Sequence, residues 1–201
     1  MTSNFAECGG FLKTRPELGV PDIQLHFGMA MVDDHGRKRH WGSGFSCHVC
    51  LLRPKSRGSV TLKNADPMQA PLIDPNFFSD PRDLDTLVAG IRISQRIMAA
   101  PILASWNGRT IYGTGRDDDE TLRQLIRAHA DTIYHPVGTC RMGDDAESVV
   151  DPSLRVRGVE GLRVVDASIM PRVVSGNTQA PCAMIGEKAA DMILAADRTS
   201  Y

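Results

Sequence analysis

The stretch IQLHFGMAM, residues 23–31, decides how the first half of this chain is folded. Large apolar residues occupy every second position, a period that is typical of a β-strand with one buried face. The turn-forming sequence DDHG follows at residues 33–36, and further strands are predicted at residues 45–52 and 59–62. Because no helix separates these strands, the sequence predicts an antiparallel sheet, since parallel neighbours need long crossover connections.

Two helices are predicted after this sheet. Asp80 can cap the first helix, Pro81 suits its first turn, and helical spacing of apolar residues continues up to Pro101. The acidic run at residues 117–120 opens a second helix that continues to about residue 133. We interpret this run as a helix N-terminus rather than a metal site, because carboxylates stabilise the positive end of the helix dipole. Two segments with glycine or proline breakers are predicted as loops: residues 1–20 and 64–81.

The predicted secondary structure changes near residue 134, which is the one candidate domain boundary. The elements predicted beyond it are two short strands, a loop and a final helix: residues 154–157, 162–165, 166–178 and 179–196. The predicted fold class is therefore α+β. An antiparallel sheet flanked by helices occupies residues 1–133, and a strand–loop–helix segment follows over residues 134–201.

Composition excludes several classes of protein. The formal net charge is −1 and 42% of residues are hydrophobic, so the chain lacks the basic surface of a general nucleic-acid binder. No apolar run is long enough to span a membrane, and the N-terminal sequence does not resemble a secretory signal. The odd number of cysteines, five, argues against a disulfide scaffold and favours the cytoplasm. Peripheral association with a membrane surface stays open.

Two motif-like patterns carry little weight. Cys47 and Cys50 have the spacing of a zinc or redox pair, but on a strand they point to opposite faces and cannot share one metal ion. The sequence GTG at residues 113–115 begins like a dinucleotide-binding fingerprint but has Asp118 in place of the third glycine. No metal site is predicted.

A histidine and a helix entrance are the stronger candidates for chemistry. His135 precedes Pro136, which restricts its backbone to an extended conformation, and imidazole is suited to proton transfer near neutral pH. Asp166 follows a predicted buried strand, and Asn177 and Thr178 stand where the final helix begins. Each of these residues also has a purely structural interpretation. His135 could be a hydrogen-bonded structural histidine, Asn177 a turn residue, and Thr178 a helix cap.

Taken together and in order, several segments strongly resemble the C-terminal part of the glucose–methanol–choline (GMC) oxidoreductases, the FAD-dependent alcohol oxidases and dehydrogenases. They are LLRPKSRG at 51–58, IDPNF at 73–77, YHPVGTCRMG at 134–143, VDP at 150–152, LRVVDAS at 162–168 and GNT at 176–178. Asn177, in place of a second histidine, is similar to the choline-dehydrogenase-like branch. The resemblance covers nearly the whole chain.

This resemblance implies oxidation of a primary alcohol to an aldehyde, with hydride transfer from carbon to flavin N5. His135 matches the family's catalytic histidine, and Asn177 matches the partner that hydrogen-bonds the substrate oxygen and contacts the flavin. Asp166 and Ala167 match positions near the ribityl and pyrophosphate groups of FAD. Thr178 and Pro181 match the stretch beside the isoalloxazine ring.

One part of the family pattern has no counterpart here. The strand–GxGxxG–helix unit that binds the FAD phosphates is missing, so we expect the chain to need an N-terminal FAD-binding half. Alone it should bind FAD weakly, show little activity and self-associate through exposed apolar surface. Two other hypotheses stay open: a non-catalytic domain that binds a small molecule or a partner, and one chain of a split flavoenzyme. The alcohol and the electron acceptor are not identified by the sequence.

Overall fold

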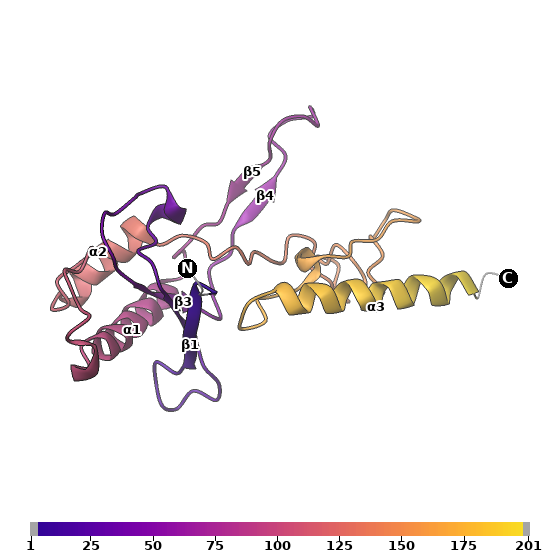
Figure 1. The fold of residues 1–201 in the computed structure, drawn as a ribbon. Coiled ribbons are helices and arrows are strands. Elements are labelled where there is room, and N and C mark those ends of the chain that lie inside the picture. The colour runs from indigo at the N-terminus through magenta and orange to yellow at the C-terminus, as the bar shows by residue number, and fades with distance from the viewer. Residues whose placement is uncertain (1–3, 199–201) are drawn as a thin grey trace. The chain divides into compact units, whose positions relative to one another are not determined.

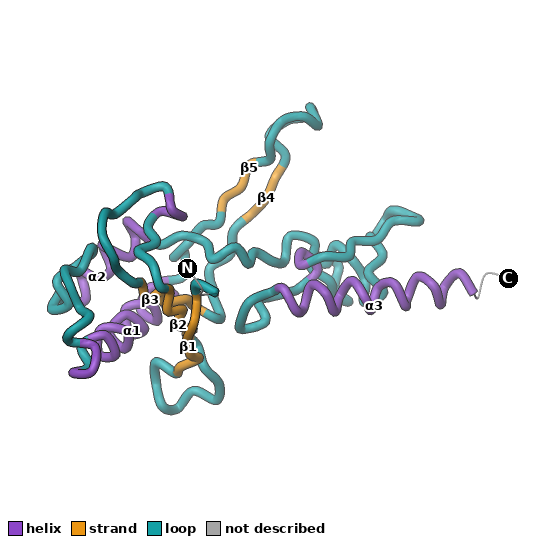
Figure 2. The backbone as a smooth tube through the Cα atoms, in the orientation of Figure 1, coloured by secondary structure: helices purple, strands orange, loops and turns teal. Residues whose placement is uncertain are grey.

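The computed structural model describes residues 4–198 (Figures 1 and 2). These residues divide into two compact units. Unit 1 contains the described residues up to Ser56 together with Phe77–Asp131. Unit 2 contains Arg57–Asn76 and the described residues from Thr132 onward. The fold class is α+β, as predicted, with antiparallel strands and separate helices. The functional boundary at residue 134 stays a prediction.

The main sheet of unit 1 has three antiparallel strands in the order β1–β2–β3. β2 (Ile23–Gly28) and β3 (Ser46–Leu51) confirm two predicted strands, although both end earlier than their apolar patterns. β1 (Ala6–Leu12) lies in a segment predicted as loop, so that prediction is wrong. Its residues are mostly exposed and include two glycines, so β1 has little buried side-chain pattern and depends on backbone pairing with β2.

Two helices complete unit 1, and both begin where the sequence predicts. The Asp80 side chain caps α1 (Pro81–Met98), and the Asp118 side chain accepts the backbone N–H of Thr121 at 2.8 Å at the start of α2 (Asp119–His129). The acidic run is therefore a helix N-terminus. α1 packs against β3 and α2, and a buried cluster joins the two helices: Leu84, Val88, Leu122 and Ile126. Short 3₁₀ turns occupy Asp34–Gly36 and Pro101–Leu103.

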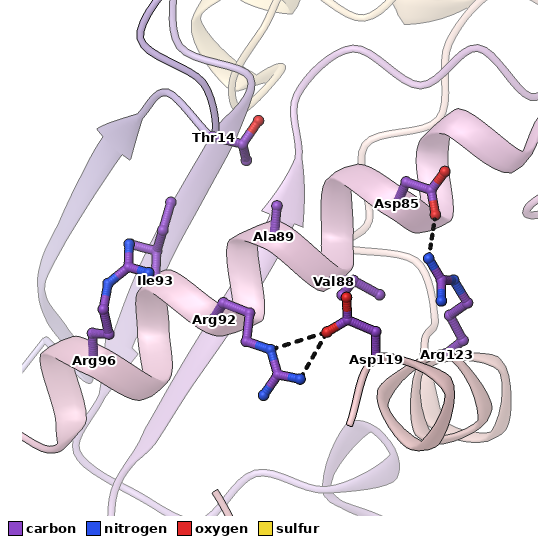
Figure 3. Close-up of a pocket in the computed structure, with 9 residues that line it drawn as sticks. All are labelled: Thr14, Asp85, Val88, Ala89, Arg92, Ile93, Arg96, Asp119 and Arg123. Atoms are coloured by element: carbon purple, nitrogen blue, oxygen red, sulfur yellow. Dashed lines mark hydrogen bonds and ion pairs between the residues drawn. The ribbon is translucent and has the colours of Figure 1, made fainter. Parts of the chain in front are cut away.

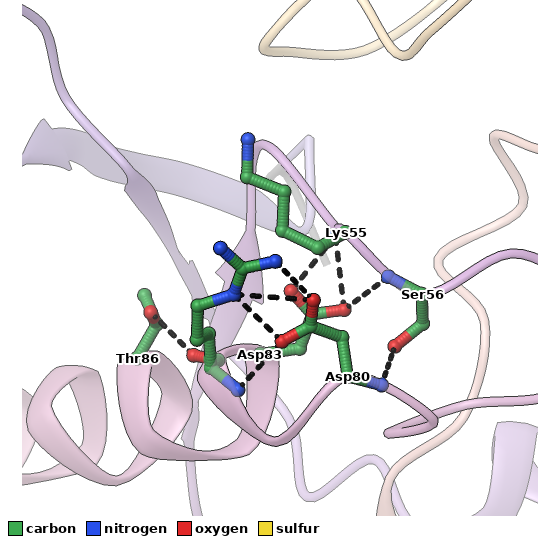
Figure 4. Close-up of polar contacts among 6 residues, drawn as sticks. Lys55, Ser56, Asp80, Asp83 and Thr86 are labelled. Atoms are coloured by element: carbon green, nitrogen blue, oxygen red, sulfur yellow. Dashed lines mark hydrogen bonds and ion pairs between the residues drawn. The ribbon is translucent and has the colours of Figure 1, made fainter.

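A buried carboxylate connects α1 to the segment after β3. Asp83 is 3% exposed, and its oxygens accept the backbone N–H of Lys55 at 2.8 and 3.0 Å and that of Ser56 at 2.8 Å (Figure 4). Buried carboxylates are costly unless they are hydrogen-bonded, and here the backbone supplies those bonds. Asp83 therefore fixes the loop that leaves the sheet as well as lying in the first turn of α1.

Unit 2 has little regular structure before its long final helix (Figure 2). β4 (Ser59–Thr61) and β5 (Leu72–Asp74) form an antiparallel hairpin, and α3 (Gln179–Arg198) begins at the predicted residue. β5 lies in a segment predicted as loop; it is short and exposed, so the sequence carries no burial pattern there.

The strands predicted at residues 154–157 and 162–165 do not form a ladder. They are reduced to isolated bridges, such as the antiparallel bridge between Arg155 and Arg163. Leu154 has a φ of 66°, in the left-handed region, which interrupts an extended chain at that point. These residues carry the apolar pattern of a strand, but the backbone turns too often to form a continuous strand.

A compact apolar core nevertheless organises unit 2. Its buried members come from irregular segments, from the 3₁₀ turn Ala167–Ile169 and from α3: Val150, Leu154, Ile169, Met170, Ile185 and Ala189. The backbone N–H of Cys140 donates to the carbonyl of Ser168 at 3.0 Å, and that of Met142 donates to Ile169 at 2.8 Å. These bonds hold the segment that follows His135 beside the 3₁₀ turn.

Candidate active site

The backbone around His135 is held in an unusual path. Tyr134 has a φ of 65°, in the left-handed region that non-glycine residues seldom adopt. Pro136 follows His135 directly and disfavours helical conformation there. His135 is half-buried, and its ring lies against the residues that lead into α3.

The ring of His135 contacts two neighbouring residues at the entrance of α3. Its Nε2 lies 2.8 Å from Nδ2 of Asn177, and its Nδ1 lies 2.8 Å from Oγ1 of Thr178. The backbone N–H of Thr178 also points at Nδ1, with a separation of 3.3 Å. The sequence-predicted pair, forty-two positions apart, is thus in direct contact. Their catalytic roles stay a prediction.

Thr178 immediately precedes Gln179, the first residue of α3. Its carbonyl accepts the backbone N–H of Cys182 at 2.9 Å, the first intrahelical bond. Only 6% of the residue is exposed, and its hydroxyl contacts His135. A threonine before a helix predicts a cap, and no signal in the sequence distinguishes a capping hydroxyl from one that contacts a histidine. The Thr178–His135 contact is therefore the feature that sequence reasoning missed.

Asp166 and Ala167 lie at the 3₁₀ turn that packs against α3. The carboxylate of Asp166 accepts the backbone N–H of Ser168 at 2.7 Å and also the Ser168 hydroxyl, so one of its oxygens caps the turn. Pro181 is half-buried in the first turn of α3. The structure therefore places the predicted residues in one unit: His135 contacts the residues at the entrance of α3, and the turn with Asp166 and Ala167 packs against that helix, with Asp166 exposed.

The cysteine pair of β3 shows no sign of a reactive or metal-binding site. Burial raises the pKa of the Cys50 thiol to about 12 and also raises the pKa of Cys47, so both thiols stay protonated near neutral pH. Among the residues described, no three His, Cys, Asp or Glu side chains form a group that could hold a metal ion.

A separate hollow of about 450 Å³ lies in unit 1, beside α1 (Figure 3). Four of its charged side chains are paired with one another, since Arg92 contacts Asp119 at 2.7 Å and Arg123 contacts Asp85 at 2.9 Å. These ion pairs leave little unsatisfied chemistry for a ligand. In the described part of the chain, no helix is both long and apolar enough to cross a membrane.

Comparison with known proteins identifies relatives of the same kind throughout. The family model of the GMC oxidoreductases matches residues 54–186. The chain is 53% identical over 195 residues to the alcohol dehydrogenase [acceptor] of Pseudomonas putida, covering 96% of this chain and 35% of that protein. It is 47% identical over 192 residues to the oxygen-dependent choline dehydrogenase of Escherichia coli O139:H28, covering 95% of this chain and 34% of the relative.

Solved structures give the same result. Pyridoxine 4-oxidase from Mesorbium loti superposes with a TM-score of 0.84 at 31% identity, over 93% of this chain and 37% of that one. A variant of Aspergillus oryzae RIB40 formate oxidase gives a TM-score of 0.83 at 32% identity, over 92% and 33% of the two chains. The chain thus spans about a third of the length of the relatives it matches.

Proposed function

We propose that this chain, which belongs to the GMC oxidoreductase family, forms the C-terminal segment of an FAD-dependent alcohol dehydrogenase of the choline-dehydrogenase-like branch. The proposed reaction converts a primary alcohol to an aldehyde, with the hydride passing to flavin N5. The observation that supports it is the 2.8 Å contact between His135 Nε2 and Asn177 Nδ2 at the entrance of α3.

The two side chains suit this chemistry. Hydride leaves an alcohol carbon more easily as the alcohol oxygen gains negative charge. His135 would take or stabilise the hydroxyl proton, and the amide of Asn177 would donate a hydrogen bond to the oxygen. Both contributions act on the same atom, which is why the two groups need to lie together.

The residues around the helix entrance fit a bound flavin. FAD, when bound, supplies the hydride acceptor. The first N–H groups of a helix lack intrahelical partners, and the exposed residues Gln179 and Ala180 stand at that end of α3. They would stabilise negative charge on the flavin carbonyl edge, with Thr178 and Pro181 beside the ring. The Asp166 oxygen that does not contact Ser168 would accept a hydroxyl of the cofactor, near Ala167.

The phosphates of FAD need a partner that these residues do not supply, so we propose that an N-terminal FAD-binding half completes the enzyme. Apolar side chains of α3 are exposed, including Met184 at 58% and Leu194 at 57%. They would be covered by that half, and the chain alone would self-associate through them.

A chimera tests the catalytic assignment. The corresponding C-terminal segment of the Pseudomonas putida alcohol dehydrogenase is replaced by this chain, since the two are 53% identical over 195 residues. His135→Ala is expected to lower kcat about 100-fold or more. His129→Ala, at an exposed position on α2, is the control and should leave turnover unchanged. Equal turnover of the His135→Ala protein and its parent, at equal FAD content, would contradict the assignment.

The isolated chain tests the need for a second half. We expect it to purify without flavin absorbance, to show no alcohol-dependent reduction of an artificial acceptor and to elute from a size-exclusion column as an oligomer. A yellow protein with a flavin spectrum would overturn the first expectation. A monomer at high concentration would overturn the last.

A further inference from the structure

We propose that Thr178 is a positioning residue that selects the tautomer of His135. In this assignment, the Thr178 hydroxyl accepts the proton of His135 Nδ1, and Nε2 is left as the proton-accepting nitrogen on the side of Asn177. The catalytic meaning of the inference rests on the proposed function, whereas the tautomer itself belongs to this chain alone.

The contacts of Nδ1 pose a choice between two proton arrangements. A neutral imidazole carries one N–H and one unprotonated nitrogen. The Thr178 hydroxyl can donate a hydrogen bond to Nδ1 or accept one from it. The backbone N–H of Thr178 can only donate, and a hydrogen bond from it would require an unprotonated Nδ1. The hydroxyl contact is 2.8 Å long and the backbone contact is 3.3 Å. The hydroxyl contact is compatible with either tautomer, whereas the longer backbone contact favours an unprotonated Nδ1, so the contact of the other ring nitrogen decides between the two tautomers.

The contact of the other ring nitrogen supplies the choice. An amide –NH₂ group is a donor only, and Nδ2 of Asn177 lies 2.8 Å from Nε2. Nε2 must then accept, so the ring proton stands on Nδ1 and donates to Thr178 Oγ1. This tautomer satisfies both 2.8 Å contacts of the ring, because the Thr178 hydroxyl can accept as well as donate, and the longer backbone contact is the one that it leaves unused.

The hydroxyl is well placed to enforce this choice. Thr178 is 6% exposed, and its carbonyl is committed to the first hydrogen bond of α3. Its backbone is therefore fixed by the helix, and its side chain has little freedom to turn away. The tautomer of a histidine is set by the hydrogen bond made by its second nitrogen, and α3 delivers that bond. A base at Nε2 requires this nitrogen to be unprotonated before the alcohol arrives.

Nitrogen NMR of the chain measures the tautomer directly. The 201-residue protein is labelled with ¹⁵N-histidine, and among its six histidines the signals of His135 are assigned by their loss in His135→Gln. At a pH where the ring is neutral, we expect Nδ1 to give a protonated-type signal and Nε2 an unprotonated-type signal. A protonated Nε2 in the unaltered chain would overturn the inference, whatever happens to any variant.

Substitutions at Thr178 give the second readout. Thr178→Val removes the hydroxyl at nearly constant volume and keeps the backbone N–H, which then becomes the only Thr178-derived hydrogen bond to Nδ1. We expect the ratio of the Nδ1–H to the Nε2–H tautomer to fall about fivefold, the effect of one modest hydrogen bond. Thr178→Ser retains the hydroxyl and should restore the original ratio. Equal ratios in the valine and serine variants would contradict a role for the hydroxyl.

The same variants in the chimera separate this inference from the proposed function. Thr178→Val should lower kcat while KM and FAD content change little, and Thr178→Ser should recover most of the loss. If His135→Ala abolishes turnover but Thr178→Val leaves both tautomer and kcat unchanged, the positioning role is wrong and the alcohol-oxidation proposal stands. If His135→Ala is fully active, the proposed function fails, and the NMR result is decided on its own.

Discussion

Unit 1 and unit 2 are stabilised by different kinds of structure. Unit 1 contains a three-stranded sheet and two capped helices, and its sequence has clear periodicity. In unit 2 the residues between Thr132 and Gln179 are mostly irregular, yet they contribute most of a compact core and hold His135 against α3. Regular elements are therefore not required to position side chains accurately. Backbone hydrogen bonds between irregular segments, together with one helix, can do so.

The largest expected effect tests whether unit 1 depends on its periodic elements alone. Asp83→Ala should destabilise the protein by about 3 kcal/mol, because it removes a buried carboxyl group that accepts the backbone N–H groups of Lys55 and Ser56. Urea unfolding followed by circular dichroism measures the loss. The control is Asp85→Ala on the same helix, which removes an exposed ion pair with Arg123 and should cost less than about 1 kcal/mol. Equal effects would mean that the buried carboxylate has no special role.

The next prediction asks whether the irregular core of unit 2 is as well packed as a regular one. Ile169, in a 3₁₀ turn, is 2% exposed, and Ile169→Ala should cost about 3 kcal/mol. Leu194→Ala, at a position on α3 that is 57% exposed, should cost far less. Urea midpoints give both values. A loss below about 1 kcal/mol for Ile169→Ala would indicate a loosely packed core.

Glycines within helices of the two units should respond with opposite signs. A Cβ at Gly90 in α1 would lie 2.7 Å from Val49 Cγ1, so Gly90→Ala should destabilise unit 1 by about 1 to 2 kcal/mol through overpacking. At Gly186 in α3 a Cβ would meet nothing within 4 Å, and Gly186→Ala should stabilise the helix by up to about 1 kcal/mol. Thermal unfolding of both variants measures the signs. A stabilising Gly90→Ala would show that α1 is free to move away from the sheet.

The smallest effect concerns a polar contact in unit 1. The hydroxyl of Tyr112 donates to Asp33 at 2.6 Å and, together with His40, lowers the pKa of that carboxyl. A lowered pKa in the folded state means that the contribution to stability is present above the ordinary carboxyl pKa, about 4, and is lost as the pH falls below it. Tyr112→Phe should cost about 1 kcal/mol near neutral pH and reduce the slope of stability against pH below the ordinary carboxyl pKa. An unchanged slope in the urea-unfolding series would contradict this origin.

The sequence predicts the elements whose side chains alternate between buried and exposed surroundings. β2, α1 and α2 carry such patterns, and Asp80 and Asp118 mark the helix starts. β1 and β5 escape prediction because their residues are mostly exposed and are ordered by pairing with a neighbouring strand. Propensity and periodicity describe one segment at a time and cannot report a partner strand.

The candidate site likewise combines features that the sequence predicts with features that it does not. The type and order of His135 and Asn177 are visible in the sequence, and their contact follows from family resemblance before it appears in the structure. The Thr178 hydroxyl and the buried oxygens of Asp83 could not be anticipated, because each appears in the sequence as a helix-start residue. Their actual partners come from distant parts of the chain, forty-three and twenty-eight positions away.

The two units alternate along the sequence, and this arrangement has a consequence for recombination. Residues 57–76 belong with the C-terminal part, while the segments on either side of them belong to unit 1, so the polypeptide passes between units at three junctions. Each unit therefore consists of two separate stretches of the chain. Neither unit can be removed by a single cut or exchanged between homologues as one continuous segment. Gene shuffling within such a chain should therefore tolerate crossovers that move the complete 201-residue block far better than crossovers placed between the hairpin and α3.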